Sequence, residues 1–240
     1  MARHGNSKSQ KRISASKALN IARKEYAWTI KASPGSHSSR LGVPLGIVLR
    51  EMLGIAGNAK EARAILNKRL VSVDGVIRTS IRQPVGLFDA VALSGMKKYY
   101  RLLLDKKGRF IAKEIPAKNS GFKLVRVTGK KLLKGKKTQL STNDGRSFVI
   151  AKEKAGIGDT LKIGIPEQKI EGIFELEKGN VVFVFTGKRT GTIAHIKDVV
   201  PGTMKRGKLV KLRTEGEEEF ETVADNVFVV GKEKPEAELE

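Results

Sequence analysis

The uneven distribution of positive charge is the feature that most limits how this chain can fold. The 240 residues carry 47 Lys and Arg against 25 Asp and Glu, a formal net charge of +22. Residues 1–140 have a net charge of +24, whereas residues 211–240 have a net charge of −6. Like charges at this density repel one another in a folded chain, so a polyanion that neutralises them best explains the surplus. Because counterion release from phosphates drives binding strongly, nucleic acid is the expected partner.

Composition argues against several other classes of protein. A hydrophobic content of 40% over 240 residues suffices for one to three modules with real cores. No run of about 18 apolar residues occurs, so no membrane span is expected. The absence of cysteine excludes disulfides, thiolate zinc sites and cysteine nucleophiles, and three scattered histidines favour no metal site. We therefore expect a cytoplasmic protein without cofactor, metal or small-molecule substrate.

Residues 1–42 are expected to form a basic N-terminal arm that binds RNA. Glu25 is the one acidic residue in this segment, and the stretch 33–39 is rich in Ser, Pro and Gly, which interrupts regular structure. Tyr26 and Trp28 are unusual in a disordered tail, which favours an arm that becomes ordered on RNA. The candidate RNA contacts in the arm are Arg3, Lys8, Lys11, Arg12, Arg23, Lys24 and Arg40.

Residues 43–94 predict two short helices followed by a hairpin. Pro44 suits the first position of a helix, and Gly54 can end that helix. A second helix is expected to begin at Asn58, because Glu61 three residues later completes a capping-box pattern. Its core face is Ala62, Ile65 and Leu66. Asp74-Gly75 between alternating apolar residues predicts a type I′ turn.

This arrangement resembles the alpha-L RNA-binding motif of ribosomal proteins, pseudouridine synthases and some aminoacyl-tRNA synthetases. The matching segments are Pro44-Leu45, Ala59–Arg63, Val71–Gly75 and Gly86–Asp89. The resemblance implies that four cations of the second helix face RNA phosphates, with Arg78 on the hairpin beside them. These four are Lys60, Arg63, Lys68 and Arg69.

Residues 95–172 predict a central β-rich module. Turn sequences such as 105–108 and 142–146 separate short apolar stretches, for example 122–127 and 147–150. Several short strands at this spacing favour a small barrel or sandwich.

Residues 173–231 contain a segment, 179–196, that resembles the KOW motif of ribosomal proteins and transcription elongation factors. An apolar strand enters a tight loop in which Gly187 and Gly191 allow a sharp turn. Lys188 and Arg189 are at the tip of that loop, where a phosphate can approach closely. The resemblance implies an SH3-like β-barrel with a closing strand, and residues 232–240 follow as an acidic tail. The expected fold class is therefore a multi-module α+β protein.

The order of these parts resembles the S4e family of small-subunit ribosomal proteins from archaea and eukaryotes. Further matching stretches are Asp74–Thr79, Asp105–Phe110, Thr142–Arg146, Asp159–Ile163 and Asn226–Gly231. The resemblance implies a structural component of the small (30S) subunit whose partners are its ribosomal RNA and neighbouring ribosomal proteins. The chain lacks the basic C-terminal extension of eukaryotic members and ends acidic, which favours an archaeal member.

Two alternatives are weighed against this interpretation. An RNA-modifying enzyme such as a pseudouridine synthase needs a separate catalytic domain, and the basic segment after residue 94 is too short for one. No phosphate-binding Gly-Lys-Ser/Thr loop, His-Glu-x-x-His pair or Gly-x-Ser-x-Gly elbow occurs either, so catalysis is not expected. A ribosome-associated or transcription-elongation factor stays open, because a KOW motif alone does not distinguish it.

Overall fold

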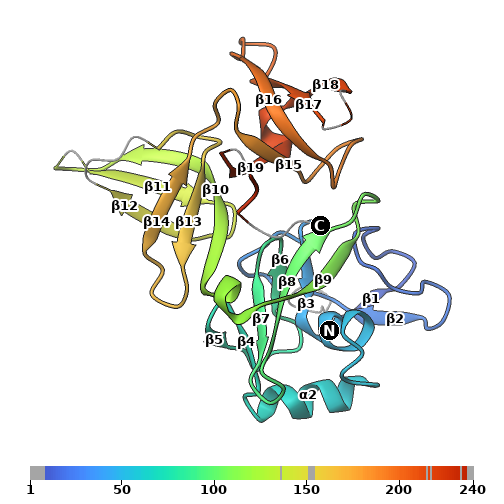
Figure 1. The fold of residues 1–240 in the computed structure, drawn as a ribbon. Helices are drawn as coiled ribbons and strands as arrows, with labels where there is room; N and C mark the ends of the chain where they lie inside the picture. Colours follow the sequence, from blue (N-terminus) through green and yellow to red (C-terminus); the bar gives the residue numbers. More distant parts are fainter. Residues whose placement is uncertain are drawn as a thin grey trace, which may run out of the picture. The chain divides into compact units, whose positions relative to one another are not determined.

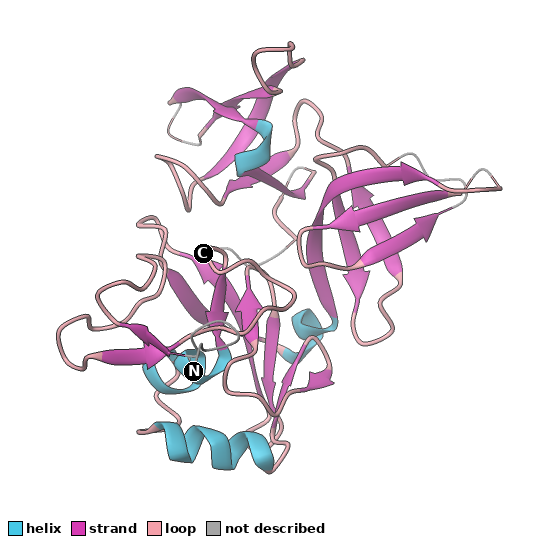
Figure 2. Ribbon diagram, turned by 180° about the vertical axis from the view of Figure 1, so that it is seen from behind, coloured by secondary structure: helices cyan, strands magenta, loops and turns pink. Residues whose placement is uncertain are grey.

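The computed structural model describes residues 9–135, 137–150, 155–214, 216, 218–232 and 234–236. The described chain is mostly β-sheet with few helices, which is compatible with the expected α+β class (Figure 2). It folds as two compact units, Met1–Leu103 with Arg109–Glu114 and Leu104–Gly108 with Ile115–Glu240 (Figure 1). The division into five parts expected from the sequence stays a prediction. No helix among the described residues is long and apolar enough to span a membrane.

The first unit is built on one five-stranded antiparallel sheet and two short ribbons. The sheet strands are β4 (Val71–Val73), β5 (Val76–Ile77), β7 (Ala90–Leu93), β8 (Lys98–Leu104) and β9 (Phe110–Ile115), in the order β5-β4-β7-β8-β9. The ribbons pair β1 (Ser9–Lys11) with β2 (Trp28–Ile30), and β3 (Gly42–Pro44) with β6 (Pro84–Gly86). The core beneath them includes Leu45, Val48, Leu49, Leu66, Phe88, Leu102 and Phe110, all buried.

The first predicted helix is shorter and more irregular than its apolar spacing suggested. Pro44 ends strand β3 and pairs with Pro84, so it precedes the helix instead of opening it. Helix α1 (Leu45–Ile47) continues as a π-helical turn, η1 (Val48–Met52), which closes through a bond from Leu53 N–H to the Val48 carbonyl. Gly54, with φ of 63°, follows the turn, as expected for a residue that ends a helix.

The second predicted helix is confirmed as α2 (Ala59–Asn67). The Asn58 side-chain oxygen accepts hydrogen bonds from the Lys60 and Glu61 N–H groups, both at 2.9 Å. Glu61 reaches back to accept from the Gly57 N–H at 2.8 Å. Ala62 and Leu66 are buried as expected, whereas Ile65 is half-buried. The cap therefore satisfies amides that no helical carbonyl reaches.

We expect Asn58→Ala to lower the free energy of unfolding of the first unit by about 1 kcal/mol, because two amides lose their acceptor. Urea unfolding followed by circular dichroism would measure the change. Asn58→Ser, which keeps an oxygen acceptor, is the matched control and should retain most of the stability. Equal stability for the alanine variant and the unsubstituted chain would contradict the role assigned to the cap.

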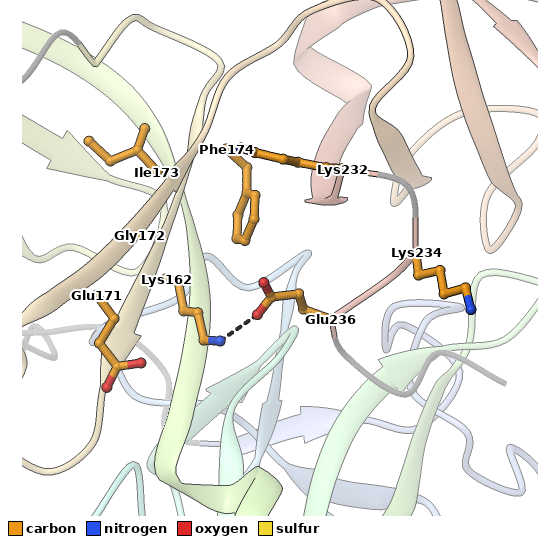
Figure 3. A pocket seen from close by; sticks show the side chains of 8 residues that line it. All are labelled: Lys162, Glu171, Gly172, Ile173, Phe174, Lys232, Lys234 and Glu236. Atoms are coloured by element: carbon orange, nitrogen blue, oxygen red, sulfur yellow. Dashed lines mark hydrogen bonds and ion pairs between the residues drawn. The ribbon is translucent and has the colours of Figure 1, made fainter.

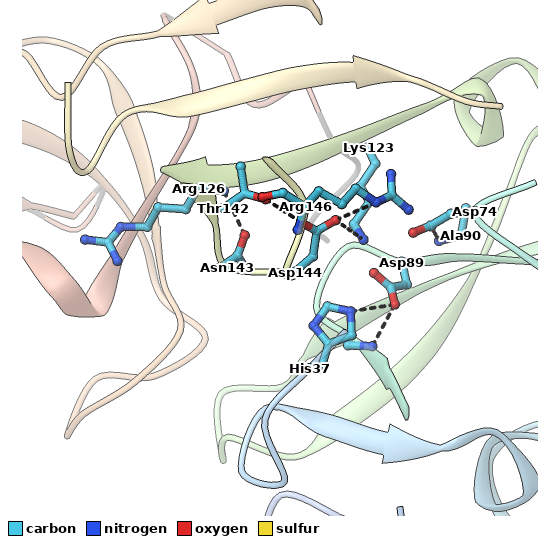
Figure 4. A network of polar contacts seen from close by, with 11 residues as sticks. His37, Asp74, Asp89, Ala90, Lys123, Arg126, Thr142, Asn143, Asp144 and Arg146 are labelled. Atoms are coloured by element: carbon cyan, nitrogen blue, oxygen red, sulfur yellow. Dashed lines mark hydrogen bonds and ion pairs between the residues drawn. The ribbon is translucent and has the colours of Figure 1, made fainter. Parts of the chain in front are cut away.

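The predicted type I′ turn is also confirmed. Asp74 and Gly75 have φ values of 49° and 73°, both in the left-handed region that this turn needs. The buried Asp74 carboxylate accepts a hydrogen bond from the Ala90 N–H at 3.1 Å, which joins the turn to β7 (Figure 4). Arg78 follows β5 and is half-buried.

The second unit contains two five-stranded antiparallel sheets. The first has the order β12-β11-β10-β13-β14, and the second has the order β18-β17-β16-β15-β19. The strands of the first sheet are β10 (Phe122–Leu132), β11 (Thr138–Thr142), β12 (Ser147–Ile150), β13 (Thr160–Gly164) and β14 (Ile170–Phe174). Those of the second are β15 (Val181–Val184), β16 (Ile193–Val200), β17 (Leu209–Arg213), β18 (Glu219–Val223) and β19 (Val227–Gly231). Short 3₁₀ helices, η2 (Ala117–Gly121) and η3 (Ala224–Asn226), precede β10 and β19.

Strand β10 is long because two partners share it. Residues 122–126 pair with β13, and residues 127–132 pair with β11 after an irregularity between Val127 and Gly129. The strand can therefore fold the sheet over a small core. That core comprises Val125, Val127, Leu140, Ile150, Ala155, Leu161 and Ile163.

A buried charge network lies beside this core (Figure 4). The Asp144 carboxylate is 3.2 Å from Lys123 Nζ and 3.1 Å from Arg146 Nε, and it accepts a hydrogen bond from Thr142 Oγ1 at 2.6 Å. Lys123 and Asp144 each have side chains only 1% exposed. Burial, the largest influence, raises the pKa of Asp144, but Lys123, Thr142 and Arg146 together hold that pKa below its ordinary value. The network keeps this carboxylate ionised inside the unit.

Candidate nucleic-acid interface

Helix α2 and the residues that end it carry four exposed cations: Lys60 and Arg63 lie in the helix, Lys68 is its C-cap, and Arg69 follows with a φ of 57°. Lys60, Arg63, Lys68 and Arg69 are all exposed, while Ala62 on the opposite side is buried. Within the part of the chain that the structure describes, these four head groups have no ion-pair partner. The neighbouring Glu61 carboxylate is engaged by the Gly57 N–H and the Asn58 side chain, so the exposed cations are suited to phosphate binding. Their contact with RNA stays a prediction.

Arg12 has a different environment from the one that the sequence suggested. Its side chain is 2% exposed and donates to the Ala22 carbonyl and to the Glu51 carboxylate, both at 2.5 Å, and to Glu25 at 3.4 Å. The guanidinium also lies 5.1 Å from the centre of the Tyr26 ring. It joins the arm to η1, so we assign Arg12 to holding the arm and leave it out of the proposed RNA contacts.

A second buried pair holds the Ser- and Pro-rich part of the arm. His37 Nε2 lies 2.8 Å from Asp89 Oδ2, and the same oxygen accepts from the Gly86 N–H at 2.9 Å (Figure 4). A Cβ on Gly86 would lie 2.3 Å from the His37 ring, so glycine is required where the ring packs. His37 and Asp89 are 52 positions apart in the sequence, so no local pattern could predict this pair.

The remaining cations of the arm differ in availability. Lys11, Lys24 and Arg40 are exposed, whereas Arg23 donates to the carbonyls of Ile13 and Ala15 at 3.0 and 3.1 Å. Arg3 and Lys8 lie outside the described residues. A pocket of about 390 Å³ opens beside the arm, and none of its lining residues is acidic. These residues are Gln10, Ser14, Ser16, Leu19, Lys31, Ala32, Ser39, Arg40, Gly42 and Pro44.

The loop between β15 and β16 has the tight geometry expected from its glycines. Gly187 and Gly191 have φ values of 109° and 82°, and the Gly191 N–H donates to the Val184 carbonyl at 2.7 Å. A Cβ on Gly191 would also lie 2.5 Å from a backbone oxygen of the same unit, so a side chain is excluded there. Lys188 is exposed. Arg189 is also exposed, but it pairs with Glu218 and lies 5.0 Å from the centre of the Phe220 ring.

Two basic hairpin tips in the second unit were not among the candidate contacts. The tip between β10 and β11 carries exposed Lys130, Lys131, Lys134 and Lys137, and the tip between β16 and β17 carries exposed Lys205, Arg206 and Lys208. A glycine within a stretch of Lys and Arg, Gly135 in one tip and Gly207 in the other, was the signal that could have identified both.

A pocket in the second unit has mixed charge, and one of its lysines is paired within it (Figure 3). Lys162 pairs with Glu236, and its ammonium lies 4.6 Å from the centre of the Phe122 ring. Glu171 also lines the pocket, which makes it a poor site for an anion. Of the predicted acidic tail, Lys232 and residues 234–236 are described, and the rest lies outside the described residues.

The fold and its basic surfaces define a modular, mostly β protein suited to a polyanionic partner, and comparison with known proteins identifies the family. Residues 96–170 match the model described as ribosomal family S4e, and residues 4–40 match the RS4NT (NUC023) domain. The chain is 41% identical over 235 residues to small ribosomal subunit protein eS4 of Methanosphaera stadtmanae, covering 98% of this chain and 97% of that protein. It is 38% identical to eS4 of Methanothermobacter thermautotrophicus, covering 88% and 87%.

A solved structure agrees with these sequence relatives. The crystal structure of 30S ribosomal protein S4e from Thermoplasma acidophilum matches with a TM-score of 0.70 and 26% identity, covering 80% of this chain and 96% of that chain. This chain belongs to the ribosomal protein S4e family, as an archaeal member.

Proposed function

We propose that this protein is a structural component of the small (30S) ribosomal subunit that binds ribosomal RNA through its basic surfaces. The observation that carries the proposal is the identity to archaeal small-subunit eS4 proteins over nearly the whole of both chains. The protein has a binding and scaffolding role, without catalysis, cofactor or small-molecule substrate. It acts in the cytoplasm on the ribosome, next to other small-subunit proteins.

The proposed RNA contacts have three parts, two on the first unit and one on the second. Helix α2 and the turn that ends it contribute Lys60, Arg63, Lys68 and Arg69, as the alpha-L resemblance of residues 43–94 suggests. The exposed arm residues Lys11, Lys24 and Arg40 form the second part, and the loop at Lys188 in the SH3-like, KOW-containing segment 173–231 forms the third. Such contacts recognise RNA by its shape and phosphates, since the major groove of an A-form helix is too narrow for side chains.

Co-sedimentation tests the proposal. Small subunits purified from the source cells and washed at moderate salt should retain the protein in equimolar amount with resident ribosomal proteins, and crosslinking should join it to the rRNA. A resident protein keeps its place because many contacts must break together. Complete release of the protein by the wash would instead favour a ribosome-associated or transcription-elongation factor. Absence of the protein from unwashed subunits would refute the proposal.

A further inference from the structure

The aromatic side chains of the arm are unusually exposed. Tyr26 and Trp28 are 60% and 58% exposed, and no other aromatic side chain in the described ranges is classed as exposed. Trp28 is the single tryptophan of the chain. Leaving large rings in water forgoes the free energy of burying them, which suggests that a partner covers them.

The ribbon that carries Trp28, β1 with β2, is part of the first unit (Figure 1). The Arg12 N–H donates to the Ala27 carbonyl at 3.0 Å, which extends the pairing of β1 with β2. The buried Arg12 guanidinium then joins the ribbon to Glu51 and supports the Tyr26 ring from 5.1 Å. A partner would therefore meet rings that are already positioned, without the entropic cost of ordering a loose arm.

The charges around the rings favour a nucleotide over a protein surface. Lys11 lies directly across the ribbon from Trp28, so the two side chains share a face. Lys24 is exposed nearby in sequence, and the carboxylate of Glu25 pairs with Arg12. An exposed ring beside uncompensated ammonium groups matches the two chemical parts of a nucleotide, a flat base and an anionic phosphate.

We propose that Trp28 is a stacking platform for an unpaired RNA base, with Lys11 contacting the adjoining phosphate. The ligand is a single-stranded segment, because the bases of a duplex are stacked on one another and do not offer a free face. This inference rests on the proposed RNA-binding function and adds to it a defined site for one nucleotide. Stacking tolerates any base, so it contributes affinity more than sequence readout.

Tryptophan fluorescence tests the proposal directly, because Trp28 is the single tryptophan of the full-length protein. Titration with a single-stranded oligoadenylate should quench the emission saturably, whereas an RNA duplex of equal length should bind with little quenching. In filter binding, Trp28→Ala should weaken single-strand affinity by about 5- to 150-fold, the range for loss of one base stack. Trp28→Phe keeps an aromatic face and should retain most of that affinity. Val149→Ala, at an exposed apolar residue on β12, is the matched control and should have no effect.

The outcomes separate this inference from the proposed function. The stacking site would be refuted if RNA binding is salt-dependent but Trp28 emission is not quenched and Trp28→Ala has unchanged affinity. The proposed RNA-binding function would then still stand. Equal losses for the alanine and phenylalanine variants would refute stacking as the cause. Protection of Trp28 from acrylamide in intact subunits, but not in RNA complexes, would show that a protein covers the ring and would overturn the inference. Absence of any RNA binding would count against the proposed function itself.

Discussion

Replacing Lys60, Arg63, Lys68 and Arg69 together by Gln is expected to weaken binding to isolated small-subunit rRNA and to flatten its salt dependence. Removing one phosphate contact should reduce the slope of log affinity against log salt by about 0.7 to 0.9, so removing four should reduce it by about 3 to 4. Raising the salt from about 50 to 200 mM should then lower the affinity of the variant by a factor about 10² smaller than the factor for the unsubstituted chain. Filter binding across this salt range measures the slope. A circular dichroism melt should show an intact fold, because all four side chains are exposed.

A matched quadruple variant tests whether the position of the cations or only the net charge of the protein sets the salt slope. Lys169, Lys178, Lys197 and Lys211 are also exposed or half-buried surface lysines, but each already pairs with a carboxylate. Replacing these four by Gln removes the same charge and should change the salt slope much less. If both quadruple variants flatten the slope equally, bulk charge, and not the cations in and after α2, determines binding.

Replacing Asp144 by Asn is expected to destabilise the second unit by about 3–5 kcal/mol, because it removes the carboxylate that faces the buried Lys123 ammonium. Urea unfolding at neutral pH measures the effect. The double variant Lys123→Met, Asp144→Leu replaces both charges by apolar groups and should recover much of the stability. Glu219→Gln is the surface control. A hydrogen bond from Lys197 lowers the pKa of Glu219, as the buried network does for Asp144, but the Glu219 carboxylate is exposed. Its loss should leave the unfolding midpoint unchanged.

The pH dependence of this effect follows from the direction of the pKa shift. Asp144 has a lower pKa in the folded than in the unfolded chain, so the unfolded chain binds the proton more readily. The stabilisation is therefore present above the unfolded pKa and is lost as pH falls through the folded pKa. The difference in stability between the unsubstituted chain and the Asn variant should narrow in that acidic range. A difference that stays constant down to the lowest pH would contradict the assignment.

Local chemistry allowed part of this fold to be predicted. Asn58 with Glu61 marked the start of α2, and Asp74-Gly75 marked the hairpin turn, because each signal acts within a few residues. The π-helical turn after α1 was not predictable from apolar spacing, because a segment of five residues is too short to separate the two helix types. The sharing of β10 by two partners depends on pairings between distant segments, and no local pattern encodes them.

The candidate interface shows the same division. Exposure of Lys60 and Arg63 followed from helical spacing, since the buried Ala62 and Leu66 fix the opposite face of α2. The left-handed backbone of Arg69 beyond the helix end was not predictable from that spacing. The burial of Arg12 could not be predicted from the sequence, because its partner Glu51 is 39 residues away. An arginine count alone cannot distinguish a side chain that reaches outward from one that holds the arm in place.

The anchoring of the arm by Arg12 and His37 has a calorimetric consequence. A segment that folds as it binds contributes a large negative heat-capacity change in addition to that of the contact itself. Residues 9–42 are already packed on the first unit, so we expect the heat-capacity change on RNA binding to be small. The enthalpy of association should accordingly vary little when the temperature of the titration is changed by about 30 °C.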